Sequence, residues 1–190
     1  IVDSWAPPSS VGYDLNIASF GNGPLNDDVC SALFIPNGVF TLGNNSCSSD
    51  MGEPPPPLCW SFPGIVNSVW YKAIVPASGN VTVSVQLLTL QDSQIEVFTG
   101  SCSALNSLID GCNDNAADNC GGGSLASEVH LSGLTPGDTL FIRVDGTFDQ
   151  VGTFNIMASD TLNSQAFNQQ DCLGAISVCN PVINQTTSFF

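Results

Sequence analysis

The chain has 190 residues, 43% of them hydrophobic, and its 17 acidic side chains against two basic ones give a net charge of −15. This length suits one folded domain and little more. The charge excludes nucleic-acid binding, which depends on Lys and Arg at phosphates, and it excludes docking on an anionic membrane. No stretch of 18 apolar residues occurs, so we expect no insertion into a membrane.

Short runs with a two-residue hydrophobic period follow one another along the chain. They cover 69–75, 81–85, 94–99, 125–131, 139–145 and 152–159. Turn-forming segments such as 76–79 and 135–138 separate them, and helical periodicity is confined to short pieces near 103–109. The pattern predicts an all-β fold, an antiparallel β-sandwich of the jelly-roll or immunoglobulin-like kind. In 139–145 we expect Leu140, Ile142 and Val144 to face the core.

Eight cysteines indicate an oxidising, extracellular setting, because their number is even and the chain is rich in Ser, Thr and Asn. A zinc site with Cys112, Cys120 and the single histidine, His130, is the competing interpretation. The chain has no C-x2-C pair, which favours disulfides over zinc.

Two disulfides can be predicted from spacing. Cys102 and Cys112 follow successive strands one turn apart, and we expect them to pair. Cys47 and Cys59 flank the proline tract 54–57, and we expect them to close its base. The partners of four further cysteines stay open: Cys30, Cys120, Cys172 and Cys179.

The chain contains an internal repeat. Residues 1–3 and 12–19 resemble 143–145 and 152–159, and residues 28–35 resemble 171–178, at offsets of 140 to 143 positions. A strand, a linker and a following strand therefore occur twice, which is typical of a tandem array. We predict that 1–19 ends a preceding repeat, 20–160 is one complete sandwich repeat, and 161–190 holds a linker and the first strand of a following repeat.

Several of these segments resemble known β-sandwich repeats. Residues 68–72 (SVWYK) with 76–83 (PASGNVTV), 95–102 (IEVFTGSC), 112–115 (CNDN) and 134–146 (LTPGDTLFIRVDG) are similar to the signature of bacterial pre-peptidase C-terminal domains. The opening of 171–180 resembles domains of giant surface proteins exported by the type IX system of Bacteroidetes. The resemblance implies a sandwich repeat of a large surface adhesin or filament protein.

Residues 110–119 are the candidate metal-binding segment. Asp110, Asn113, Asp114 and Asp118 offer carboxylate and amide oxygens, the ligands that calcium takes in proteins. The alternative is a solvated loop of Asx turns. Calcium is the one cofactor that we expect.

No catalytic constellation is recognisable, and we expect the chain not to be an enzyme. His130 lies on an alternating strand, which favours an exposed imidazole over a general base. Trp5, Trp60 and Phe62 lie near proline-rich segments and are candidates for stacking on sugar rings, whereas Trp70 is expected in the core.

Two functions remain open. The first is a structural or adhesive repeat at the cell surface, acting as a rigid, disulfide-stapled spacer whose partners are neighbouring copies in an oligomer or filament. The second is a module that binds carbohydrate or protein and is attached to a secreted enzyme, with a glycan as the expected partner. Repeats at near-constant spacing favour the first.

Overall fold

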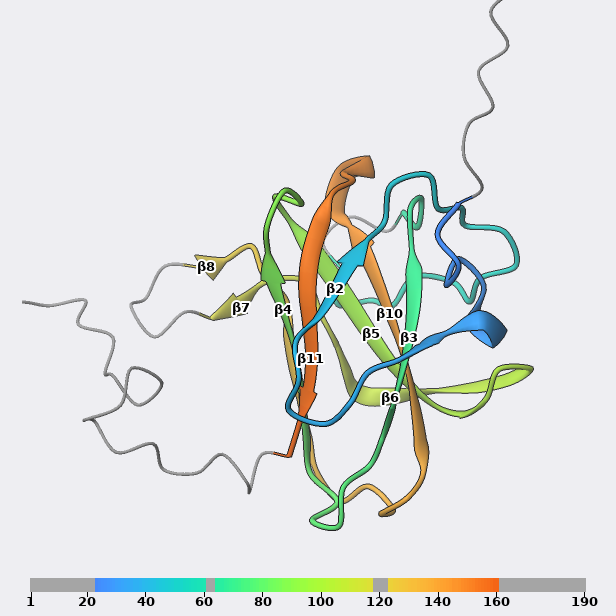
Figure 1. The fold of residues 1–190 in the computed structure, drawn as a ribbon, viewed down its shortest axis with the longest axis vertical. Helices are drawn as coiled ribbons and strands as arrows, with labels where there is room; N and C mark the ends of the chain where they lie inside the picture. The colour runs from blue at the N-terminus through green and yellow to red at the C-terminus, as the bar shows by residue number, and fades with distance from the viewer. Residues whose placement is uncertain (1–22, 61–63, 118–122, 161–190) are drawn as a thin grey trace, which may run out of the picture.

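The computed structural model describes residues 23–60, 64–117 and 123–160, and within them the chain forms a β-sandwich (Figure 1). One sheet has five strands, in the order β1, β3, β10, β5, β6. Their bounds are Leu33–Phe34, Val69–Ile74, Thr139–Gly146, Ser93–Ser101 and Ala104–Asn113. The other sheet has four strands, in the order β2, β11, β4, β9, with bounds Thr41–Asn44, Thr153–Ser159, Val81–Leu87 and Glu128–Leu131.

Among the described strands of the two sheets, β1 and β3 form the one parallel pair, and all other pairs are antiparallel. A small third ladder joins β7 (Ala116–Ala117) to β8 (Gly123–Ser124). Two short 3-10 turns, η1 (Val29–Ser31) and η2 (Thr147–Asp149), complete the described elements. The predicted all-β sandwich is confirmed.

The core lies between the two sheets, where the two-residue period places every second side chain. Leu140, Ile142 and Val144 are fully buried, as predicted. The alternating side chains of the second sheet meet them: Val81, Val83, Val85, Phe154 and Ile156. The turn at 76–79 needs Gly79, whose φ is +70°, a conformation that glycine adopts without steric cost.

Most predicted strands are present, and two expectations are wrong. Residues 125–131 form a strand only from Glu128 onward. The short helical pieces near 103–109 lie in β6, an edge strand with a register shift against β5 between Glu96 and Phe98. Its burial pattern lacks a regular alternation, because an edge strand leaves much of both faces in water.

The described chain begins and ends at opposite ends of the sandwich (Figure 1). Gly23 lies against the carbonyl of Cys47, and Asn45 contacts the 147–150 turn through Gln150. Asp160 contacts Ser78 and Asn37 at the other end. We call residues 23–27, 47–52 and 147–150 the N-terminal pole, and residues 36–40, 76–79 and 133–138 the C-terminal pole.

Strands β3, β10 and β11 each run from one pole to the other. The eight residues of β10 therefore set the poles about 25 Å apart. The array boundaries predicted at 1–19 and 161–190 lie outside the described residues, so that part of the domain division stays a prediction. Within the described ranges, no helix is both long and apolar enough to cross a bilayer.

Candidate functional site

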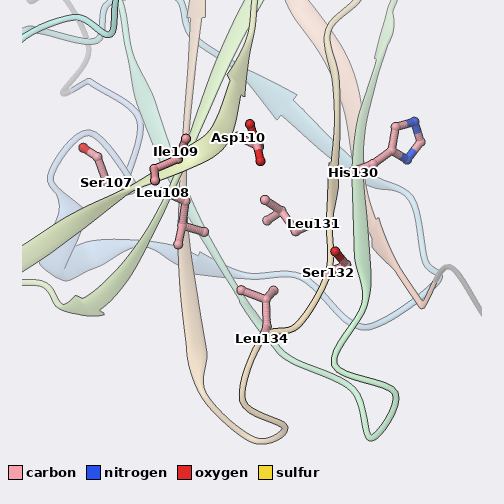
Figure 2. Close-up of a pocket in the computed structure, with 8 residues that line it drawn as sticks. All are labelled: Ser107, Leu108, Ile109, Asp110, His130, Leu131, Ser132 and Leu134. Carbon is pink, nitrogen blue, oxygen red and sulfur yellow. The ribbon is translucent and has the colours of Figure 1, made fainter.

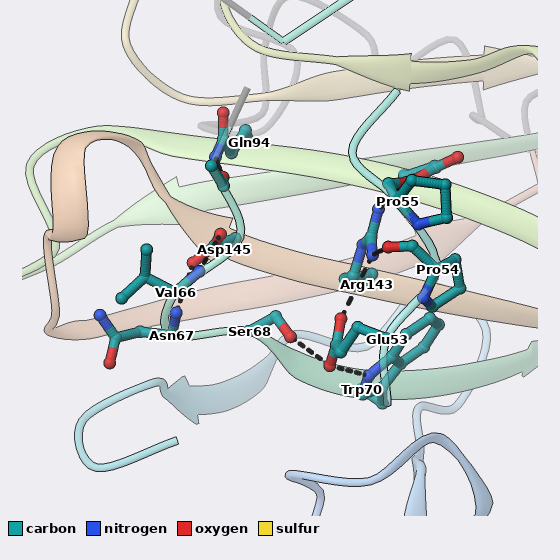
Figure 3. A network of polar contacts seen from close by, with 12 residues as sticks. Glu53, Pro54, Pro55, Val66, Asn67, Ser68, Trp70, Gln94, Arg143 and Asp145 are labelled. Atoms are coloured by element: carbon teal, nitrogen blue, oxygen red, sulfur yellow. Dashed lines mark hydrogen bonds and ion pairs between the residues drawn. The ribbon is translucent and has the colours of Figure 1, made fainter. Parts of the chain in front are cut away.

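The outer face of the five-stranded sheet carries a buried arginine beneath a proline-rich segment (Figure 3). Arg143 stands on β10, whose other alternate side chains fill the core, so the guanidinium points away from the second sheet. Its side chain is fully buried. Residues 53–60 cover it; we call this segment the strap.

Arg143 binds both the strap and the sheet. Its Nη1 donates to a carboxylate oxygen of Glu53 at 3.2 Å and to the carbonyl of Pro54 at 2.7 Å. Its Nη2 donates to the Glu96 carboxylate at 2.5 Å and to the carbonyl of Pro55 at 3.3 Å. Proline carbonyls are free to accept because the tract makes no ladder of its own. One arginine therefore ties two carboxylates and two strap carbonyls together.

Three aromatic rings surround the same guanidinium. The Arg143 Cζ atom lies 4.9 Å from the ring centroid of Trp60, 5.6 Å from that of Phe98 and 5.7 Å from that of Trp70. Cations are attracted to aromatic faces at such distances. The rings and the two carboxylates together replace the water that the guanidinium loses on burial.

Glu53 is the carboxylate through which the strap meets β3. Its Oε1 accepts from the hydroxyl of Ser68 at 2.5 Å and from the indole N–H of Trp70 at 2.7 Å (Figure 3). Burial raises the pKa of the Glu96 carboxyl more than the nearby Arg143 lowers it. Both glutamates are almost fully buried, so the cluster is a fixed structural element without an accessible acid.

Asp145 holds the segment that leads from the strap into β3. Its carboxylate accepts from the backbone N–H groups of Val66 and Asn67 at 3.2 and 3.1 Å (Figure 3) and from that of Gly146 at 2.8 Å. Burial raises the pKa of Asp145, and these donors oppose the rise. The residue orders the loop before β3.

Two disulfides fasten the same face, and both predicted pairings are wrong. Cys30 is bonded to Cys102, and Cys59 of the strap is bonded to Cys112. Cys102 and Cys112 cannot reach each other because they lie near opposite ends of β6, about 30 Å apart at 3.3 Å per residue. Three of the four cysteines expected in disulfides are thus bonded, with other partners.

Cys47 differs from the expectation because it carries a free, exposed thiol among the described residues. It stands at the N-terminal pole, while the strap turns Cys59 toward β6. Cys120, Cys172 and Cys179 lie outside the described residues. Cys112 is bonded to Cys59, so it is not available as a ligand in the alternative zinc site.

The predicted calcium ligands do not form one loop. Asp110 is exposed in the middle of a strand, β6, and Asn113 ends it. Asp114 is buried and accepts from the hydroxyl of Thr147 at 3.2 Å and from the amide of Asn115 at 3.2 Å. Asp118 lies outside the described residues, and the described ones contain no group of three potential metal-ligating side chains. Calcium binding stays a prediction, testable by melting the protein with and without chelator.

A groove of about 380 Å³ opens between the edge strands β6 and β9. Leu108, Asp110, Leu131 and Leu134 line it, and the ring of His130 points away from it (Figure 2). His130 is exposed, as predicted, and contacts Thr82 and Glu128 at 3.0 Å each. His130 and Asp110 therefore do not form an acid–base pair.

Of the aromatic candidates for sugar binding, Trp60 is buried within the strap, and the others lie outside the described residues. Trp60 is only 4% exposed, and its indole N–H donates to the carbonyl of Ile95 at 3.1 Å. Trp70 is buried as predicted, although it packs on the outer face with Phe98 and not between the sheets. Trp5 and Phe62 lie in segments that the structure does not describe.

Comparisons with known proteins do not identify the family of the chain. No protein-family model matches the chain, and no curated protein matches it. Among solved structures, the chain is similar to the pre-peptidase C-terminal domain of a collagenase from Bacillus anthracis. The match has 10% sequence identity and a TM-score of 0.42, and it covers 67% of this chain and 93% of that domain. A likeness at this level carries no argument about function.

Proposed function

We propose that the chain is a structural repeat domain of a large extracellular or cell-surface protein, in which it acts as a rigid, disulfide-stapled spacer without catalytic activity. The observation that carries the proposal is the path of the backbone: the described chain enters at one pole and leaves at the other, and Cys30 near the entry is bonded to Cys102. The sequence resemblance to surface proteins of Bacteroidetes favours an adhesin or filament as the whole protein, with adhesion itself assigned to other parts.

Hydrogen bonds hold the first and last described segments of the chain to the sandwich. Asn26 exchanges two hydrogen bonds with the backbone of Trp70, at 2.8 and 2.9 Å. Asp27 accepts from the backbone N–H and the hydroxyl of Ser49. At the other pole, Asp160 accepts from Ser78 at 2.7 Å and donates its backbone N–H to Asn37 at 3.0 Å. A force applied along the chain therefore enters and leaves the sandwich through ordered contacts.

The Cys30–Cys102 bond shortens the path that such a force can follow. Once the sandwich yields, tension passes from Cys30 directly to Cys102, and the sequence separation of 72 between them carries no load. At about 3.5 Å per residue, the bond hides roughly 250 Å of chain from extension. The strap and strands β1 to β5 lie inside this protected loop.

Single-molecule stretching tests the proposal. The full chain is held at residues 1 and 190, and the extension gained on unfolding is compared before and after reduction, with a Cys30→Ser variant as the matched control. We expect reduction to lengthen the gain by about 250 Å. The oxidised variant should lengthen it by only about 65 Å, because the Cys59–Cys112 bond, with a sequence separation of 53, still hides the chain between its two cysteines. A full-length extension of the oxidised protein would contradict the spacer role.

A further inference from the structure

We infer that consecutive repeats touch through their poles: the N-terminal pole of one copy forms an apolar contact with the C-terminal pole of the copy before it. This inference rests on the proposed tandem arrangement and names the surface that each copy presents to the next. The partner is thus a second copy of this chain.

The first argument is the length of the tether. Residues 12–19 resemble 152–159, and β11 ends at Ser159, beside the C-terminal pole. By this resemblance the last strand of the preceding repeat ends at Ser19. Only four Cα steps then separate Ser19 from Gly23, which lies against Cys47 at the N-terminal pole. Four steps span at most about 14 Å.

The second argument is that the described repeat holds its own end of the tether. Asn26 and Asp27 are held by Trp70 and Ser49. Where the chain leaves the sandwich, Asp160 is held by Ser78 and Asn37, although the matching position before this repeat is Phe20. A tether of at most about 14 Å keeps the two poles next to each other. A longer linker would let the repeats move apart.

The third argument is the composition of the two poles. At the N-terminal pole, the side chains of Leu25 and Met51 are 96% and 85% exposed. At the C-terminal pole, Val39 and Phe40 are each about half exposed. A contact between the poles would bury these four side chains, and burial of apolar surface favours association.

The internal repeat extends to this surface. Moving 142 positions along the chain takes Leu25 to Phe167, Asn26 to Asn168 and Cys30 to Cys172. Leu25 and Phe167 are both apolar. Asn26, which binds the backbone of β3 in the described repeat, corresponds to another asparagine, Asn168. The sequence therefore repeats the anchor and the apolar tip together.

Charge opposes the contact, so apolar burial must drive it. Asp27, Asp50 and Asp149 lie at the N-terminal pole, and Asp138 lies at the other. The chain has only two basic residues, and Arg143 is buried. Salt screens like charges at these distances, so the contact should strengthen as ionic strength rises.

A two-repeat chain tests the inference. Residues 23–190 are joined after residue 162 of a first copy, which keeps the same four Cα steps between Ser159 and Gly23 that separate Ser19 from Gly23. Nuclear spin relaxation then gives the rotational correlation time of each repeat. We expect about twice the value of the single chain, because rigidly joined repeats tumble as one body. Leu25→Ser in the second copy should shorten this time, and added salt should lengthen it in the unsubstituted protein.

Ile109→Ser is the matched control, because Ile109 is 99% exposed but lies on β6 away from both poles. We expect it to leave the correlation time unchanged. Independent tumbling of the unsubstituted repeats, or an equal effect of both substitutions, would overturn the pole contact. The stretching experiment does not depend on this contact, so the spacer proposal and the inference can fail separately.

Discussion

Arg143 and Glu96 face each other across strands β10 and β5, and their side chains meet at 2.5 Å on the outer face of the sheet. Arg143 is one of two basic residues in a chain with 17 acidic ones. One of the two basic residues of the chain is therefore buried. Removing one partner of such a pair leaves an uncompensated buried charge, which costs more than the pair contributes.

Replacing the arginine should therefore destabilise the domain strongly. We expect Arg143→Met to lower the free energy of unfolding by about 3–5 kcal/mol, because Glu53 and Glu96 lose their counterion under the strap. Equilibrium unfolding in urea measures this change. Lys72→Met is the control, since Lys72 is half-exposed on the neighbouring strand and should change stability by less than about 1 kcal/mol.

The double variant Arg143→Met with Glu96→Gln separates charge from packing. The double variant should regain part of the lost free energy of unfolding, because only one of the two carboxylates is then left without its counterion. If Arg143→Met unfolds at the same urea concentration as the unsubstituted protein, the cluster does not hold the strap.

The burial of Arg143 shows where sequence reasoning stops. The two-residue period of 139–145 correctly placed Leu140, Ile142 and Val144 inside, which puts Arg143 and Asp145 on the outer face. Periodicity cannot show that a distant strap covers that face. A clue was present: a rare cation stands on an otherwise apolar strand, and a proline tract followed by Trp60 lies elsewhere in the chain.

The two disulfide predictions are wrong for a related reason. Spacing along the chain favoured partners that are close in sequence, whereas the bonded cysteines are separated by 72 and 53 positions. Which cysteines meet depends on the order of strands in the sheet, and connectivity cannot be read from the sequence alone. The predicted strands do not include β6, because its residues lack a clear alternation.

Mild acid should stabilise the domain. Burial raises the pKa of Asp92, Glu96 and Asp145 above the ordinary carboxyl values of 3.8 and 4.5. The folded state therefore binds these protons more tightly than the unfolded state, and the stability they contribute is lost as pH rises through the raised values. Relief of the net negative charge acts in the same direction.

We expect the melting temperature to rise as the pH is lowered from neutral toward the ordinary carboxyl values. Calorimetry over this range measures it. Glu96→Gln should flatten the dependence, because one of the three titrating groups is removed. A melting temperature that falls steadily on acidification would contradict the raised pKa values.

Strong alkali should unfold the domain through Tyr71. Burial raises the pKa of the Tyr71 phenol from 10.0 to about 12, against a smaller opposing effect of a hydrogen bond with Asn26. The phenol lies in the core, edge-on to Phe154. The stability that comes from keeping it neutral is complete below pH 10 and is lost as pH rises toward 12.

Tyrosinate absorbance measures this titration, and Tyr71→Phe is the control. We expect the phenol to ionise together with unfolding, near the upper end of that range. The variant should lose this step. Reversible ionisation of both tyrosines near pH 10 in the folded protein would place Tyr71 in water.

Trypsin can determine the disulfide connectivity in one digestion, because the chain has only two cleavage sites. Cutting after Lys72 and Arg143 of the denatured, alkylated but unreduced protein yields fragments 1–72, 73–143 and 144–190. Both observed bonds join the first fragment to the second. We therefore expect 1–72 and 73–143 to stay linked until reductant is added. The pairs Cys102–Cys112 and Cys47–Cys59 would each lie within one fragment and leave the two separate. Cys30→Ser and Cys59→Ser should each preserve the link through the other bond, and the double variant should abolish it.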